Sequence, residues 1–203
     1  YARMALEEQM VGIVLSNSEP AMVPTYGQAP LIGENPIAIA IPTAEDLPPF
    51  VLDIATSATS RQKLEEAVRH REPIPEGVAL DAAGAATKDP KAALEAMRLL
   101  PLGSDPRTGS HKGYGLGLAI DILSGVLSGT VPLGETPAER AHGEVAARGA
   151  PRIYYPGEIE FDIDQERRAS GIPLDKGAQS ELEGLSRRLD IHDAWEHLVE
   201  GRK

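Results

Sequence analysis

The stretch at residues 110–129, SHKGYGLGLAIDILSGVLSG, is the most informative part of this chain. The basic pair His111-Lys112 precedes closely spaced glycines, and an apolar pattern of helical period follows. Backbone N–H groups left free at a helix start, with an ammonium group nearby, form a site for an anion such as a phosphate. We expect a helix over about 115–127. Its core-facing residues are predicted to be Leu116, Ile120, Leu123 and Leu127.

The glycine spacing matches neither of two common phosphate-binding motifs. A Rossmann fingerprint needs a strand directly before its glycines, whereas residues 103–111 are typical of a loop. A P-loop has its lysine after the glycines, whereas Lys112 comes before Gly113. Two roles stay open for these glycines, close packing of the helix and anion binding.

The rest of the chain alternates short strands with helices. Short apolar runs predict buried strands at 11–15, 37–41 and 50–54, and extended segments at 78–81 and 152–155. Apolar period and N-cap residues predict further helices at 2–10, 61–69, 90–97 and 174–189. Because no regular βαβ array emerges, we expect an α/β (mixed α+β) fold with a mixed, largely non-Rossmann sheet flanked by helices.

Composition excludes several classes of function. The chain has no cysteine, so disulfides, thiolate nucleophiles and Cys–metal sites are excluded. A formal net charge of −11 and an aromatic content of 4% argue against nucleic-acid binding, although one basic pocket suffices for a small phosphorylated ligand. No apolar run reaches the roughly 18–20 residues that span a bilayer, and no signal peptide is evident. We therefore expect a cytoplasmic protein without a membrane partner.

Two polar groups that follow predicted strands are candidate ligand residues. Asp53, near the end of the strand at 50–54, could accept hydrogen bonds from ribose hydroxyls or cap the turn and helix that follow. The cluster at 16–19, which contains Ser18 and Glu19, marks a ligand site or, as the favoured alternative, a plain turn. The five histidines lack metal-ligand spacing, so no metal site is predicted.

Nine blocks in a fixed order carry a family resemblance. They are VGIVLSNS at 11–18, GENPIA at 33–38, FVLDIATS at 50–57, TKDP at 87–90, PLG at 101–103, HKGYGL at 111–116, LSGVLSG at 123–129, YPGE at 155–158 and GIPL at 171–174. In these blocks the chain resembles the malate/L-lactate dehydrogenase family of the non-Rossmann type. That family includes ureidoglycolate, sulfolactate and diketogulonate dehydrogenases and reductases.

The resemblance implies hydride transfer between NAD or NADP and a 2-hydroxy or 2-oxo acid, in a homodimer. It implies a cofactor-binding core at 1–129, a loop or shortened connection at 130–150, and a strand, turn and helix at 151–203 that return to the core. It places Glu19 near the active centre as a candidate catalytic residue. The residues it implies for cofactor binding are Ser18, Asp53, Ile54, Ala55, His111, Lys112, Gly113, Gly157 and Glu158.

The sequence departs from the family pattern in several places. The acid/base histidine of the family lies in a motif that would precede Tyr1, and the Gly-Thr-Asn-Pro of the family is Gly33-Glu34-Asn35-Pro36. Residues 130–150 are short and polar where the family has a strand of the central sheet. Hydride transfer to a carbonyl needs a proton donor. The alternative hypothesis is therefore a catalytically inactive fragment or remnant that binds cofactor or only oligomerises.

Overall fold

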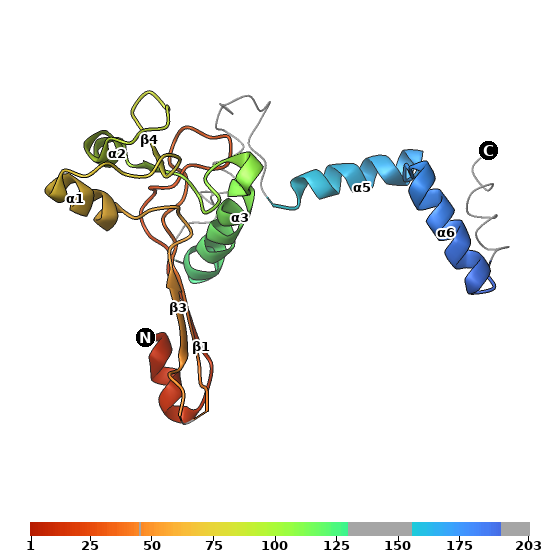
Figure 1. Ribbon diagram of the computed structural model, residues 1–203, viewed down its shortest axis with the longest axis horizontal. Coiled ribbons are helices and arrows are strands. Elements are labelled where there is room, and N and C mark those ends of the chain that lie inside the picture. Colours follow the sequence, from red (N-terminus) through yellow and green to blue (C-terminus); the bar gives the residue numbers. More distant parts are fainter. Residues whose placement is uncertain (45, 130–155, 192–203) are drawn as a thin grey trace. The chain divides into compact units, whose positions relative to one another are not determined.

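The computed structural model describes residues 1–44, 46–129 and 156–191 (Figure 1). The chain divides into two compact units, Tyr1–Pro156 and Gly157–Lys203. Helices and small sheets intermingle, which confirms the mixed α/β class. The connection predicted at 130–150 and the strand predicted at 152–155 lie outside the described residues.

Three strands of the first unit form an antiparallel sheet. They are β1 (Gly12–Leu15), β2 (Ile37–Ile41) and β3 (Phe50–Ile54), in the order β1-β2-β3. Ile13 lies opposite Ile39, which in turn lies opposite Leu52. Opposed residues share a face of the sheet, so one face carries large apolar side chains. The other face, the small-residue face, has Gly12, Ala38 and Ala40 on β1 and β2 and also carries Val14, Val51 and Asp53.

The helix predicted at 2–10 is present as η1 (Ala2–Glu8), a 3₁₀-helix beside the strands (Figure 1). It packs close to the small-residue face, because a Cβ at Gly12 would collide with the backbone oxygen of Ala2. On the same face, Ala40 is fully buried. The small residues of β1 and β2 therefore allow η1 to approach the sheet.

The strand positions are confirmed, but their predicted burial is wrong for much of the sheet. Ile13 is 61% exposed and Phe50 is 51% exposed. A run of apolar residues indicates a strand but does not say which face is covered. Here η1 lies against the small-residue face, which leaves the large side chains of the opposite face accessible within the described part of the chain.

A helical layer with its own core follows the sheet. Ser60 caps α1 (Arg61–His70) and Asp89 caps α2 (Pro90–Ala96), each by accepting a hydrogen bond from a backbone N–H, so both predicted helix starts are confirmed. A two-stranded antiparallel sheet joins β4 (Ala79–Leu80) to β5 (Arg98–Leu99). The shared core consists of Ala21, Leu64, Ile74, Ala79, Ala93 and Leu99.

The helix of the informative stretch begins earlier than predicted. A short 3₁₀ turn, η2 (Pro106–Thr108), leads into α3 (Ser110–Asp121), which continues as a π-helical turn, η3 (Ile122–Val126). The predicted core face is wrong, since Leu116, Leu123 and Leu127 are exposed and only Ile120 is buried. The buried face of α3 contains Gly113, Tyr114, Gly117 and Leu118. Hydrophobic periodicity overlooks glycines, although they permit the closest packing.

The second unit contains two described helices. The predicted helix near 174–189 is confirmed as α6 (Lys176–Arg188), which Asp175 caps. The sequence reasoning missed α5 (Glu158–Ser170). Its signals are acidic residues in the first turn, basic residues in the last turn and a glycine directly after it. These signals lie in charge and helix termination and not in apolar period, so hydrophobic periodicity does not reveal this helix.

Candidate functional site

Residues 33–35 hold the loop that contains Ser18. The Ser18 N–H donates to Asn35 Oδ1 over 3.1 Å, and Ser18 Oγ accepts a hydrogen bond from the Glu34 N–H over 3.1 Å. A Cβ at Gly33 would collide with Ser18, so only glycine allows this approach. Side-chain hydrogen bonds therefore fix the 16–19 loop more firmly than a plain turn would.

Asn35 connects the Ser18 loop to α3. Its side chain is fully buried, and Nδ2 donates to the Gly117 carbonyl over 2.9 Å and to Asp121 Oδ1 over 3.0 Å. Asp121 is itself only 5% exposed. One asparagine side chain thus bonds to two segments of the first unit that lie far apart in the sequence.

The segment that follows β3 is hydrogen-bonded to Glu34, the neighbour of Asn35. The Thr56 N–H and Oγ1 both donate to the Glu34 carbonyl over 2.8 Å. Glu34 Oε1 accepts a hydrogen bond from the Arg61 N–H over 2.7 Å, at the start of α1. Residues 53–55, which directly precede Thr56, are thereby held beside residues 33–35. The structure therefore brings the Ser18 loop and residues 53–55 together around one short stretch, and α3 joins them there through Gly117 and Asp121.

Two glycines of α3 serve close packing. A Cβ at Gly113 would collide with the backbone of Leu102, and one at Gly117 would come within 2.8 Å of Thr56 Oγ1. Of the two roles left open by the sequence, the structure shows packing for Gly113 and Gly117. A role of this stretch in anion binding then depends on the side chains of His111 and Lys112.

The basic pair lies within α3, not before it. His111 and Lys112 are exposed on the first turn, and no side chain caps the helix at Gly109, whose φ is 97°. A buried hydrogen bond of 3.1 Å between Thr25 Oγ1 and Ser110 Oγ fixes the helix start. The Ser110 and Lys112 N–H groups already donate to the carbonyls of Asp105 and Gly109. A lysine here opposes the helix dipole, and its exposed ammonium suits an anionic ligand through its own charge.

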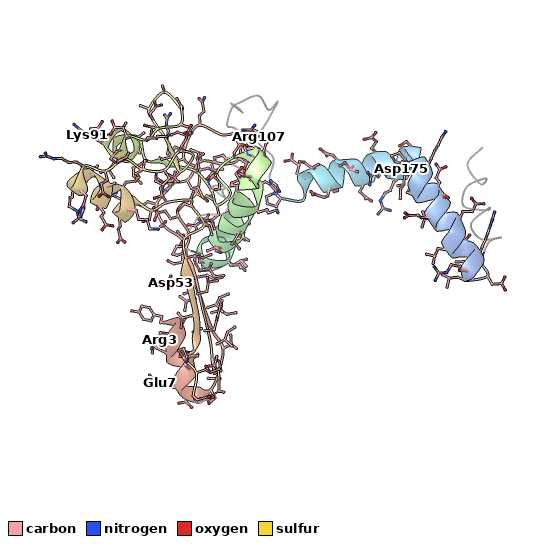
Figure 2. All side chains as sticks on the ribbon, viewed as in Figure 1. Arg3, Glu7, Asp53, Lys91, Arg107 and Asp175 are labelled. Carbon is pink, nitrogen blue, oxygen red and sulfur yellow. The ribbon has the colours of Figure 1, made fainter. Side chains whose placement is uncertain are left out.

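Asp53 is exposed on β3, opposite Ala38 (Figure 2). The alternative role as a cap of the following helix is filled by Ser60 and Glu34 instead. Ile54 and Ala55, which follow Asp53, are half-buried. Within the described residues the Asp53 carboxylate makes no hydrogen bond, so its oxygens can accept from a ligand.

The remaining predicted site residues are Glu19, Gly157 and Glu158. Glu19 is exposed in the loop beside Ser18. Gly157 and Glu158 belong to the second unit, where Gly157 has a φ of 91° at the start of α5 and Glu158 is 7% exposed. A positive φ at Gly157 explains why glycine stands there.

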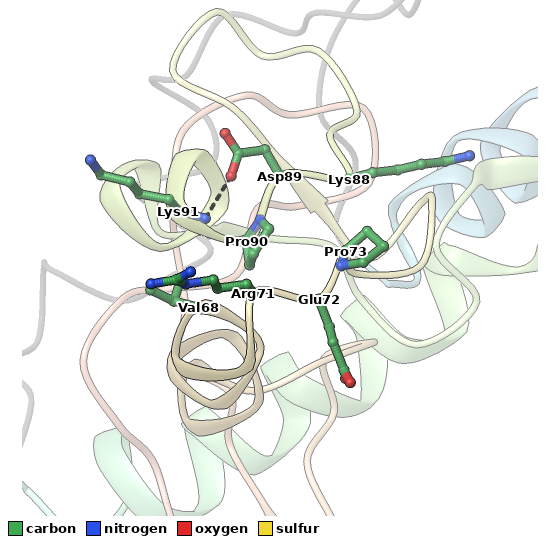
Figure 3. A pocket seen from close by; sticks show the side chains of 8 residues that line it. All are labelled: Val68, Arg71, Glu72, Pro73, Lys88, Asp89, Pro90 and Lys91. Atoms are coloured by element: carbon green, nitrogen blue, oxygen red, sulfur yellow. Dashed lines mark hydrogen bonds between the residues drawn. The ribbon is translucent and has the colours of Figure 1, made fainter.

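An open cleft of about 440 Å³ lies between the end of α1 and the start of α2 (Figure 3). None of the predicted site residues lines it. Its Lys88 pairs with Glu76 over 2.9 Å, and the ammonium group lowers the pKa of that carboxyl below its ordinary value. The residues that line the cleft are Val68, Arg71, Glu72, Pro73, Lys88, Asp89, Pro90 and Lys91.

The described residues contain neither a metal-binding cluster nor a helix that could span a membrane. Across residues 1–44, 46–129 and 156–191, no cluster of three His, Asp or Glu side chains could hold a metal ion. Over the same residues, no helix has the length and apolar character that crossing a membrane requires.

Comparison with known proteins identifies the family. Residues 1–146 match the profile of the malate/L-lactate dehydrogenase family, and the chain belongs to it. It is 36% identical to the L-sulfolactate dehydrogenase of Methanothermobacter thermautotrophicus over 95% of the chain, and 48% identical to the malate dehydrogenase of Pyrococcus horikoshii over 94%. The chain spans 62% of the length of each of these relatives.

Solved structures show the same relationship. The malate dehydrogenase of Entamoeba histolytica matches with a TM-score of 0.61 at 28% identity, over 94% of this chain and 64% of that one. The sulfolactate dehydrogenase of Methanocaldococcus jannaschii matches with a TM-score of 0.55 at 33% identity, over 94% and 62%. The family resemblance expected from the sequence is thereby confirmed in sequence and in fold.

Proposed function

We propose that this chain forms the dinucleotide-binding part of an NAD- or NADP-dependent oxidoreductase that interconverts 2-hydroxy and 2-oxo acids. The observation that carries the proposal is the joining of the Ser18 loop, residues 53–55 and α3 around residues 33–35. Family membership supports the reaction class, because relatives of this chain are named malate and sulfolactate dehydrogenases.

The donors and acceptors in the first unit fit a nicotinamide dinucleotide. The exposed ammonium of Lys112, on the first turn of α3, suits a pyrophosphate. The exposed carboxylate of Asp53 suits ribose hydroxyls, which donate hydrogen bonds. Ser18 Oγ accepts from Glu34 and keeps its own proton to donate. We assign His111, Gly113, Gly157, Glu158, Ile54 and Ala55 to the same cofactor on the family resemblance.

The chemistry requires a proton as well as a hydride. Reduction of a 2-oxo acid consumes one reduced nicotinamide and one proton and yields the 2-hydroxy acid, and the bound nicotinamide would supply the hydride. A group of the protein must donate the proton to the carbonyl oxygen as negative charge develops there. Glu19, exposed beside Ser18, is our candidate for exchanging that proton.

A turnover assay tests the proposed reaction. The 203-residue chain is mixed with NADH or NADPH and either pyruvate or oxaloacetate, and the nicotinamide absorbance is followed. Oxidation of the dinucleotide that depends on the acid is the expected result. If neither dinucleotide is oxidised, although one of them binds, the chain is a cofactor-binding remnant and the catalytic part of the proposal fails.

We also propose that the protein is a cytoplasmic homodimer, since its reaction would draw on the dinucleotide pool of the cell. The exposed apolar face of the three-stranded sheet supports self-association, because Ile13 and Phe50 lie on it and are more than half exposed. The mass of one chain is 21.6 kDa, and sedimentation equilibrium at micromolar concentration should give twice that value. A mass of one chain at all concentrations would contradict the dimer.

A further inference from the structure

We infer that Asn35 is the positioning residue of the proposed dinucleotide site. It would hold the Ser18 loop against α3 without itself touching the cofactor. The inference rests on the proposed function, since it concerns the two segments to which we assign the Ser18 and Lys112 contacts. Three observations carry it, namely the use of the Asn35 side-chain atoms, the spacing of its partners on α3, and the tight packing around them.

The side chain of Asn35 has no donor left for a ligand. An asparagine amide offers two N–H donors and one carbonyl oxygen. The two donors are used on the Gly117 carbonyl and on Asp121 Oδ1, and the oxygen accepts from the Ser18 N–H. The residue is fully buried as well. Asn35 therefore acts on a ligand only through the segments it connects.

The spacing of its partners on α3 fixes how that helix is turned. Gly117 and Asp121 are four residues apart, so their bonds to Asn35 lie one above the other on a single helix face. Two contacts on one face restrain both the translation of a helix and its rotation about its axis. Lys112 is five residues before Gly117, about 140° around the helix axis, so a rotation of α3 would move its ammonium relative to the Ser18 loop.

The residues around these bonds are closely packed, and the backbone at Asn35 restricts which residue can stand there. A Cβ at Gly117 would come within 2.8 Å of both Met22 Cε and Thr56 Oγ1. The backbone of Asn35 has a φ of 35°, a left-handed conformation that asparagine and glycine tolerate better than most residues. Loss of the amide would leave the buried Asp121 carboxylate and the Ser18 N–H each without one hydrogen-bond partner.

The main test compares Asn35→Gly with Leu64→Ala. Glycine tolerates the backbone conformation at 35 and removes all three side-chain bonds. Leu64 is fully buried in the core shared by α1 and α2 and takes part in none of the three Asn35 bonds, so Leu64→Ala lowers stability and leaves those bonds in place. Affinity for NADH and NADPH, melting temperature and amide exchange of Ser18 are measured for both variants and the unchanged chain.

Asn35→Gly should weaken dinucleotide binding by roughly tenfold or more, because small misplacements of binding groups are costly. It should also accelerate exchange of the Ser18 amide, whereas Leu64→Ala should change neither at a comparable loss of melting temperature. Equal affinities in Asn35→Gly and Leu64→Ala would overturn the inference. If the unchanged chain binds neither dinucleotide, the proposed function fails, and unaltered Ser18 exchange in Asn35→Gly would then overturn the positioning role separately.

A second pair of variants keeps the test decisive if Asn35→Gly does not fold. Asp121→Asn retains a carbonyl oxygen that can accept from Asn35 Nδ2, whereas Asp121→Leu removes it. Asp121→Asn should therefore restore most of the dinucleotide affinity that Asp121→Leu loses. Equal affinity in these two variants would contradict a role for the bond between Asn35 and Asp121.

Discussion

Asn35 Nδ2 donates to Asp121 Oδ1 over 3.0 Å, across 86 residues of sequence, and both residues are buried. This bond, together with the one from Asn35 to the Gly117 carbonyl, attaches α3 to the loop of Ser18. The proposed site therefore depends on a buried polar connection and not on apolar packing alone. Such connections are specific in geometry because an unpaired buried group is costly.

Gly113→Ala should destabilise the first unit. The added Cβ would collide with the backbone of Leu102, which cannot move without shifting its loop. We expect a loss of about 1–3 kcal/mol in the free energy of unfolding, measured by urea denaturation. The matched control is Gly184→Ala on α6, where the added Cβ meets nothing within 4 Å. That control should be neutral or stabilising by up to about 1 kcal/mol, and equal destabilisation by both variants would contradict the packing role of Gly113.

The packing of α3 shows what the sequence could and could not predict. The caps at Ser60 and Asp89 were predictable, since capping is local chemistry that a few adjacent residues decide. The buried face of α3 was not, because its glycines add nothing to an apolar pattern and their partners Leu102 and Thr56 come from other segments.

Some residues of the candidate site could likewise be predicted from the sequence, and others could not. Ser18, Asp53 and Lys112 could be singled out because each is a polar or charged residue beside a predicted strand or helix start. Asn35 could not be assigned a role, although it stands in a recognised block, since its three partners lie on segments that only the fold brings together. Tertiary hydrogen bonds of this kind have no local signature.

Asp53→Ala should weaken dinucleotide binding without lowering stability. The Asp53 carboxylate is exposed and makes no hydrogen bond within the described residues, so the fold does not depend on it. Loss of a charge-assisted contact to ribose should raise the dissociation constant for NADH by about tenfold. Asp46→Ala, which removes another exposed carboxylate between β2 and β3, should leave that constant unchanged. A parallel loss in both variants would indicate a general charge effect instead.

Glu76 and Lys88 should make stability depend weakly on acid pH. The Lys88 ammonium, by hydrogen bonding and charge, holds the pKa of Glu76 below its ordinary value of 4.5 in the folded chain. A lowered folded pKa means that the stabilisation is present above pH 4.5 and is lost as pH falls through the folded value. Glu76→Gln should therefore melt slightly below the unchanged chain at neutral pH.

The melting difference between Glu76→Gln and the unchanged chain should shrink in acid. It should also shrink in high salt, because both side chains are mostly exposed and the pair is screened. A difference that persists unchanged in acid would contradict the assignment of this effect to the Glu76 carboxylate.

Fluorescence titration with NADH and NADPH tests most directly whether the start of α3 binds the phosphates of a nicotinamide dinucleotide. The unchanged 203-residue chain, Lys112→Ala and the control Lys91→Ala are titrated in low salt. Lys91 is an exposed lysine at the start of α2, beside the cleft that holds none of the proposed site residues. We predict saturable binding to the unchanged chain and to Lys91→Ala, and binding at least about tenfold weaker to Lys112→Ala. Absence of binding by the unchanged chain at millimolar dinucleotide, or equal affinity in all three proteins, would contradict the account.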